Sequence, residues 1–517
     1  MQRRDFLRTF SAFSAISAVA AVAGRPAFAL SPDGQAFDAA VATQPWLQPF
    51  KGVTDQDLHC DALALWGRWP ADLRGRFLRN GPALNERDGQ RYRHWFAGDG
   101  MVQQFSFTGS GRGHKTPAVR HLGRLVRTPK LLAEQKAGRF LYSAYGTKIT
   151  NDQADAAGAQ GPDTFNVANT NALEHAGRVL AMWEGGSAFA LNPDDLATLG
   201  PVTWQEGLAQ MPFSAHPKID AAGHLWNIGS AGANLVVWHV DAAGKLVNAQ
   251  IGESPYPGGM AHDAAMTERF IVLPLPPVKL DFGEDVAAGH AFTYEPREPL
   301  RILVMRKDDI AQRRVFELPS QMVFHVGNAH DRADGSIALS FVSSPTPEFV
   351  MRGAVSLMAG HPASFGGSST QLAVLDMRTG QAPVEAFEDT VEFPRVHPMR
   401  NGLATRWLLT AAAWAGGAEA PHGFHGLQLR DLQTGRAQRF DYGSRTVVEE
   451  HIVVPKPDAR DARGELDAWL LGTTFDTAQG VTRVNLLDAR HIADGPIATA
   501  TLPYWLPYGF HGNFTAA

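Results

Sequence analysis

The chain has 517 residues, of which 19% are charged, and its formal net charge is −5. This balance provides no basic field for the phosphate backbone of DNA or RNA, so we expect no nucleic-acid partner. The single cysteine, Cys60, excludes an intramolecular disulfide and cysteine-based zinc or iron–sulfur sites, which leaves His, Asp and Glu as the metal ligands to consider.

The first residues have the composition of an export signal. Arg3 and Arg4 precede a run rich in Ala, Ser and Phe, and the triplet 27–29 has the small-x-small pattern of a cleavage site. The run is shorter than the roughly 20 apolar residues that span a bilayer and is diluted by serine, which disfavours a membrane anchor. We predict a twin-arginine signal peptide over residues 1–29, recognition by the twin-arginine export machinery and a periplasmic mature protein.

The rest of the chain is predicted to be rich in β-strands. Residues 30–59 are mixed and contain prolines, so we expect an extended N-terminal arm there. From residue 60 to 517, short apolar runs such as 235–240 and 372–376 are followed by Gly- and Asp-containing turns. This rhythm predicts a single all-β domain, either a propeller or a large sandwich. A strict repeat is absent, so periodicity does not give a number of blades.

One helix is predicted within this β-rich region. Residues 130–145 combine apolar and charged side chains in the manner of a short amphipathic helix. We interpret this helix as a cap over one face of the domain, and we keep a peripheral membrane contact as the alternative.

Several short motifs carry more specific information. Two Gly-containing motifs, 79–82 and 94–101, bracket a cluster of aromatic and charged residues. Four histidines, His216, His262, His325 and His511, each lie in a separate motif, at residues 213–220, 260–263, 324–329 and 508–512. Together, in this order, the motifs resemble those of the carotenoid cleavage oxygenase family over nearly the whole predicted mature chain.

The resemblance implies a fold, a metal and a reaction. The fold is a seven-bladed β-propeller with short helical segments and loops capping one face, and the four histidines would hold an axial Fe(II). The expected reaction uses dioxygen to cleave a conjugated carbon–carbon double bond of a small apolar substrate. Four neutral imidazoles leave the positive charge of the ion in place, and in an octahedral field they leave positions open for dioxygen.

Three glutamates match the positions at which the family supports its histidine ligands. These residues are Glu184, Glu392 and Glu450. A ligating histidine usually donates its second ring N–H to a carboxylate, which fixes the tautomer of the ring. The sequence leaves open which glutamate supports which histidine.

Trp183 bears on the substrate. Members of the family that cleave phenolic stilbenes tend to carry lysine at the corresponding position, immediately before the first of these glutamates. An aromatic residue favours an apolar polyene, so we expect a carotenoid or apocarotenoid and keep a stilbene-type phenylpropanoid as the alternative.

Three functions other than oxidative cleavage are compatible with an exported propeller, and the histidines bear on two of them. The four intact histidines argue against a non-catalytic exported propeller that only binds ligands. A calcium-centred hydrolytic propeller is disfavoured because calcium prefers oxygen ligands. Isomerisation without oxygen use, which occurs within the same family, stays open.

Overall fold

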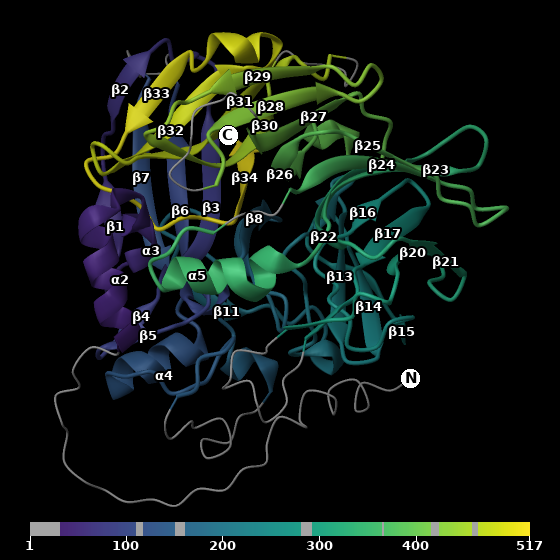
Figure 1. Cartoon of the computed structure of the whole chain (residues 1–517), viewed down its shortest axis with the longest axis horizontal. Coiled ribbons are helices and arrows are strands. Elements are labelled where there is room, and N and C mark those ends of the chain that lie inside the picture. Colours follow the sequence, from purple (N-terminus) through teal and green to yellow (C-terminus); the bar gives the residue numbers. More distant parts are fainter. Residues whose placement is uncertain are drawn as a thin grey trace, which may run out of the picture.

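The computed structural model describes residues 32–109, 117–149, 161–280, 292–363, 367–414, 423–457 and 464–517. Within these ranges, seven antiparallel sheets of four or five strands are arranged as the blades of a propeller (Figure 1). The predicted all-β, seven-bladed fold is therefore confirmed. The predicted signal peptide, residues 1–29, lies outside the described residues.

Five blades are built from strands that follow one another along the chain. The first strand of each blade lies innermost, where neighbouring first strands such as β22 and β26 contact each other. Their strands are β8 (Asn171–His175), β9 (Arg178–Met182), β10 (Phe189–Leu191) and β11 (Thr198–Pro201); β12 (Lys218–Ile219), β13 (Leu225–Ala231), β14 (Asn234–Val240) and β15 (Leu246–Glu253); β16 (Ala265–Met266), β17 (Phe270–Leu275), β20 (Leu300–Arg306) and β21 (Arg313–Leu318); β22 (Met322–Asp331), β23 (Ile337–Ser344), β24 (Ser369–Leu375) and β25 (Val384–Ala386); and β26 (Thr390–Arg395), β27 (Trp407–Ala413), β28 (Gly426–Asp431) and β29 (Ala437–Asp441).

The two remaining blades combine strands from both ends of the domain. In the first, β34 (His511–Ala516) pairs with β3 (Gly75–Leu84), followed by β6 (Asp99–Phe107), β7 (Val119–Leu125) and β1 (Leu58–Cys60). In the other, β30 (Thr446–Pro455), β31 (Ala468–Asp476), β32 (Val481–Asp488) and β33 (Ala498–Thr501) end with β2 (Ala64–Gly67). The ring is thus closed twice, by β34 on the inside and by β2 on the outside. Two small ribbons complete the sheets: β4 (Glu86–Arg87) with β5 (Gln90–Arg91), and β18 (Val278–Leu280) with β19 (Phe292–Tyr294).

The core lies between blades rather than at one central point. One apolar cluster joins Ile302 and Val304 of β20 to Leu339 and Phe341 of β23, in the next blade. Because a blade is covered on both faces, its central strands read as nearly continuous apolar runs rather than as alternating patterns. This double burial explains why the apolar runs are visible in the sequence.

The segment that we expected to be an extended arm is largely helical. It forms α2 (Pro32–Thr43), a 3₁₀ turn at Pro45–Leu47 and α3 (Gln48–Lys51). Phe37, Trp46 and Phe50 are at most 5% exposed and pack in one cluster with Trp95 and Leu357. The expectation of extended structure was wrong because burial of these aromatic side chains on the propeller stabilises the helices.

Further helices lie over one region of the propeller, with α5 crossing the middle of the view in Figure 1. Helix α4 (Pro129–Ala137) confirms the predicted helix but ends early, at Gly138, whose positive φ terminates it. Its buried Lys130 binds Asp99 and Glu134, at 2.9 Å each. Helix α5 (Ala354–Met358) continues a π-helical turn, Phe349–Gly353. The other 3₁₀ turns are Trp95–Ala97, Pro162–Thr164, Glu206–Leu208, Pro398–Arg400 and Ala489–Asp494. Across the described ranges, every helix is too short or too polar to cross a bilayer.

Ring closure on β34 can be tested at Asn513. Its side-chain amide donates to the Asn171 side chain and to the Ala172 carbonyl, at 2.9 Å each, and so joins β34 to the next blade. Asn513→Ala should lower the free energy of unfolding in urea by about 1–2 kcal/mol, because both acceptors lose their donor. Gln433 is exposed and its backbone N–H donates to Asp431, so Gln433→Ala is the matched control for loss of a side-chain amide. Equal stability of the two variants would contradict this role.

Candidate metal centre

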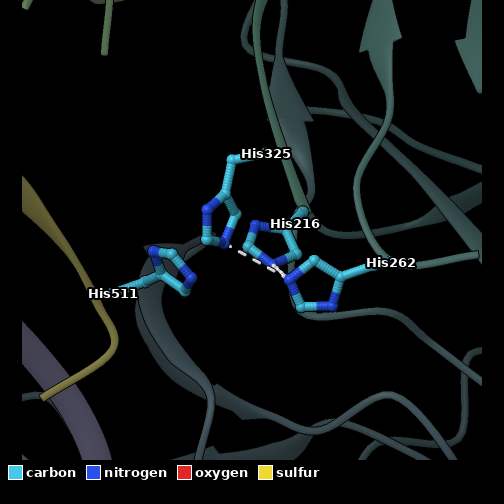
Figure 2. A group of neighbouring side chains, drawn as sticks. All are labelled: His216, His262, His325 and His511. Carbon is cyan, nitrogen blue, oxygen red and sulfur yellow. Dashed lines mark hydrogen bonds between the residues drawn. The ribbon is translucent and has the colours of Figure 1, made fainter. Parts of the chain in front are cut away.

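The four histidines singled out in the sequence meet on the inner side of the propeller. His216 lies just before β12 and His262 just before β16, while His325 lies in β22 and His511 begins β34. One ligand nitrogen from each ring lies within 4.8 Å of the others, and the rings face a common point (Figure 2). Four different blades therefore supply one imidazole each.

The histidine cluster is closely packed and buried. The Nε2 atoms of His216 and His262 lie 3.1 Å apart, and those of His262 and His325 lie 3.3 Å apart. Each of the four side chains is at most 8% exposed. Burial lowers the pKa of His511 to about 4, and burial together with the neighbouring histidines lowers the pKa of His216 well below its usual value. These two imidazoles are neutral near pH 7, as metal ligands must be.

Each predicted glutamate supports a different histidine. Glu184 accepts a hydrogen bond from Nδ1 of His262. Glu392 in β26 lies 2.5 Å from Nδ1 of His325, and Glu450 in β30 lies 2.9 Å from Nδ1 of His511. The structure thus pairs the residues that the sequence left unpaired, and each carboxylate comes from a different blade than its histidine.

One of these contacts also changes a pKa. Burial alone would lower the pKa of His262, but the negative charge and hydrogen bond of Glu184 outweigh it and raise that pKa above its usual value.

Among the described residues, His216 has no such hydrogen-bond partner. The nearest carboxylate oxygen, Oδ1 of Asp263, lies 4.0 Å from its Nδ1. Asp263 instead accepts hydrogen bonds from Nζ of Lys218 and from the backbone N–H of Val326, at 2.8 Å each. The ring of His216 is therefore held by packing rather than by a direct hydrogen bond to a carboxylate.

A guanidinium lies behind Glu450. Nε of Arg395 donates to Oε1 of Glu450 and Nη2 donates to the carbonyl of Gly512, both at 2.9 Å. The backbone N–H of Gly512 donates to the other carboxylate oxygen, at 2.8 Å. Burial raises the pKa of Glu450, but the charges of Arg395 and His511 prevail and lower it to about 2.

Sequence reasoning missed the roles of Arg395 and Lys218. Lys218 follows His216 by two residues, and Arg395 follows Glu392 by three. Proximity along the chain was the only available signal, and it does not show that Arg395 binds Glu450 rather than Glu392.

A cavity opens onto the histidines. It measures about 1320 Å³, including space open to solvent, and its walls contain His262, His325 and His511. Trp183 lies in the wall, next to Glu184. Most other wall residues are apolar or aromatic: Phe50, Trp95, Phe96, Tyr145, Met260, Phe292, Met322, Phe324, Phe349, Val350, Phe393, Phe424, Tyr508 and Phe510.

The donor set fits a transition-metal ion. Three of the rings direct their Nδ1 hydrogen at a glutamate, so each of those rings presents the lone pair of Nε2 to the shared centre. The Nε2 atoms of His216 and His262 are 3.1 Å apart and those of His262 and His325 are 3.3 Å apart. Lone pairs so close together repel one another unless a cation lies between them. Imidazole nitrogen suits iron, zinc, copper and nickel, whereas calcium and magnesium prefer oxygen.

The comparisons with known proteins agree with this geometry. The family model described as RPE65, retinal pigment epithelial membrane protein, matches residues 52–516. The chain belongs to this family, that of the carotenoid cleavage oxygenases. The apocarotenoid-15,15′-oxygenase of Synechocystis sp. is 28% identical, with 93% of this chain and 98% of the relative covered.

Two solved structures share the fold of this carotenoid cleavage oxygenase family member. The crystal structure of cobalt-substituted Synechocystis apocarotenoid oxygenase has a TM-score of 0.79 at 26% identity and covers 92% of this chain and 99% of its own. The lignostilbene dioxygenase of Pseudomonas brassicacearum has a TM-score of 0.77 at 26% identity, with 90% and 96% covered.

A buried histidine near the cavity predicts that the stability of this oxygenase fold depends on pH. His94 is 3% exposed, Nε2 donates to the carbonyl of Val350, and burial lowers its pKa to about 4. In the unfolded chain His94 takes up a proton near pH 6.5, whereas the folded protein resists protonation until about pH 4. The free energy of unfolding should therefore fall as the pH drops from 6.5 to 4.

The dependence can be measured by urea unfolding at pH 7 and pH 5. His94→Gln removes the titrating group, so the difference in unfolding free energy between the two pH values should be smaller than in the wild type. His59, whose side chain is 67% exposed, provides the control His59→Gln, which should leave the wild-type difference in place. An unchanged difference in His94→Gln would contradict the assignment.

Proposed function

We propose that this protein is an Fe(II)-dependent dioxygenase that cleaves a conjugated carbon–carbon double bond of a carotenoid or apocarotenoid into two carbonyl products. The observation that carries the proposal is the four-histidine centre at the wall of an apolar cavity. The similarity to an apocarotenoid oxygenase over 93% of the chain supports the same chemistry.

The residues of the centre have separate tasks in this proposal. The Nε2 atoms of His262, His325 and His511, with a ring nitrogen of His216, would hold the ferrous ion. When bound, the ion supplies a binding place for dioxygen beside the substrate. Glu184, which accepts from Nδ1 of His262, keeps the proton on the far nitrogen of the ring, as the other two glutamates do for their partners.

The cavity explains how an uncharged substrate is oriented. Along the described part of the wall there is no Lys or Arg, and the carboxylate of Glu449 is paired with Arg79 behind it. A polyene offers no charge to bind, so aromatic walls must position it by contact and must keep water away from the reacting bond.

The stilbene alternative is disfavoured by the pairing of two wall residues, Tyr145 and Trp183. Burial raises the pKa of Tyr145 above its usual value, and the charge of Glu184 adds to this rise, so the phenol stays neutral. The Tyr145 side chain is hydrogen-bonded to that of Trp183. Trp183 thus stands where a lysine could bind a phenolate. The indole N–H of Trp183 already has a partner within the protein, the phenol of Tyr145.

The proposed centre predicts the effect of removing one ligand. His325→Ala should abolish cleavage and reduce bound iron to background, because the ion would lose one of its four ligands and the cavity would lose part of its wall. The urea transition should persist, since the blades pack without the metal. The measurements are iron per protein by elemental analysis and carbonyl products by mass spectrometry after aerobic incubation with polyenes and stilbenes.

The control for this experiment is His330→Ala, in the same strand but outside the cluster. It should retain both iron and products. Full iron occupancy in His325→Ala would refute the ligand assignment, and iron-loaded wild-type protein that consumes no oxygen with any substrate would refute the dioxygenase proposal.

The substrate class is tested at Trp183. Trp183→Lys should lower cleavage of an apolar apocarotenoid by roughly tenfold, because a charged side chain in the apolar wall disfavours binding of an apolar substrate. A tenfold loss corresponds to about 1.4 kcal/mol. The same change should raise cleavage of a 4-hydroxystilbene, which gains a cation for its phenolate. Trp183→Phe is the matched control and should keep the apocarotenoid activity. A high wild-type activity on the stilbene that does not change in Trp183→Lys would contradict this use of the residue.

A further inference from the structure

Three carboxylates close to the metal centre are neutralised by buried or half-buried cations. Arg395 binds Glu450 at 2.9 Å and Lys218 binds Asp263 at 2.8 Å. A third pair joins the guanidinium of Arg79 to Glu449, and both side chains are at most 7% exposed. Each pair places one positive and one negative charge side by side, so together they add no net charge to the centre.

Two other carboxylates are not compensated in this way. Among the described residues, no Lys or Arg nitrogen lies within 4.0 Å of Glu184 or Glu392, whose ion-pair partners are the ligand histidines His262 and His325. A neutral histidine that directs Nε2 at a metal must carry its proton on Nδ1, so the glutamate that accepts this proton is ionised. The surroundings of the four imidazoles therefore hold two uncompensated negative charges.

We propose that Arg395 and Lys218 set the net charge of this centre so that it matches a divalent ion. The inference rests on the proposed function, which places a ferrous ion at the four histidines. Two uncompensated carboxylates balance a charge of +2, whereas a trivalent ion leaves one positive charge in a buried site, where Coulomb interactions are strong. The two cations thus keep bound iron in the ferrous form, the form that binds dioxygen.

The geometry also allows a purely mechanical role for Arg395, and the two roles differ in what they predict. Arg395 donates to Glu450, which contacts Nδ1 of His511, and to the carbonyl of Gly512, the residue after His511. It can therefore fix the position of the His511 ring. Bracing requires the guanidinium itself and does not involve Lys218. Charge matching requires only a positive charge, and it applies to Lys218 as well, although Asp263 makes no hydrogen bond to His216.

The experiment is a redox titration of the iron-loaded protein, with the ferric-to-ferrous ratio followed spectroscopically at fixed applied potentials. Arg395→Met and Lys218→Met each add one uncompensated negative charge, so each should raise this ratio by roughly tenfold, the scale on which residues behind a ligand act on a metal. Arg395→Lys keeps the charge and should stay near the wild-type ratio. The double variant Arg395→Met with Glu450→Gln removes both charges and should return toward it.

The matched control is Arg430→Met, because Arg430 forms a buried ion pair with Asp389 at 2.6 Å outside the four-histidine cluster. It should lower stability without moving the ratio. Lys218, whose side chain is 20% exposed, carries the test if Arg395→Met does not fold.

The possible outcomes separate this inference from the function on which it rests. Wild-type ratios in Lys218→Met and Arg395→Met at full iron occupancy would overturn charge matching and leave the dioxygenase proposal standing. A changed ratio in Arg395→Met and Arg395→Lys alike, with Lys218→Met unchanged, would assign bracing instead and also overturn it. Wild-type protein that binds no iron would refute the proposed function itself.

Discussion

The metal centre depends on closure of the propeller ring. His511 begins β34, which pairs with β3 so that His511 lies opposite Asn80. The other three histidines come from blades in the middle of the chain, and they reach a shared point only because the inner strands of all blades surround one axis. A sheet that stayed open at this seam would hold three imidazoles and leave the fourth in solvent.

Once the ring is closed, burial determines the chemistry of the centre. The low dielectric of the interior keeps the imidazoles of His216 and His511 neutral, which makes their lone pairs available, and it makes each carboxylate costly unless it is paired. The protein meets this second requirement in two ways: some carboxylates bind a cation, and others accept a proton from a ligand. The apolar cavity beside the centre extends the same environment to the substrate, so positioning and water exclusion come from one set of aromatic walls.

The sequence predicted the fold and named the four histidines that the structure gathers, because each histidine lies in a motif with recognisable neighbours. It could not pair Glu184, Glu392 and Glu450 with their histidines, since those pairings depend on which blades stand next to one another. The segment 30–59 was misjudged because its aromatic residues form helices only when the propeller offers a surface to bury them. Arg395 escaped notice for a related reason: its partner Glu450 lies 55 residues away in the chain.

The position of His511 also has a consequence for biosynthesis. Of the described strands, β34 is the last to leave the ribosome, and it carries the fourth ligand and completes the first blade. A nascent chain that has already folded its central blades still offers an incoming ion an incomplete set of nitrogens. We therefore expect tight metal binding only once β34 has joined the domain, because a chain that ends before β34 lacks the fourth imidazole.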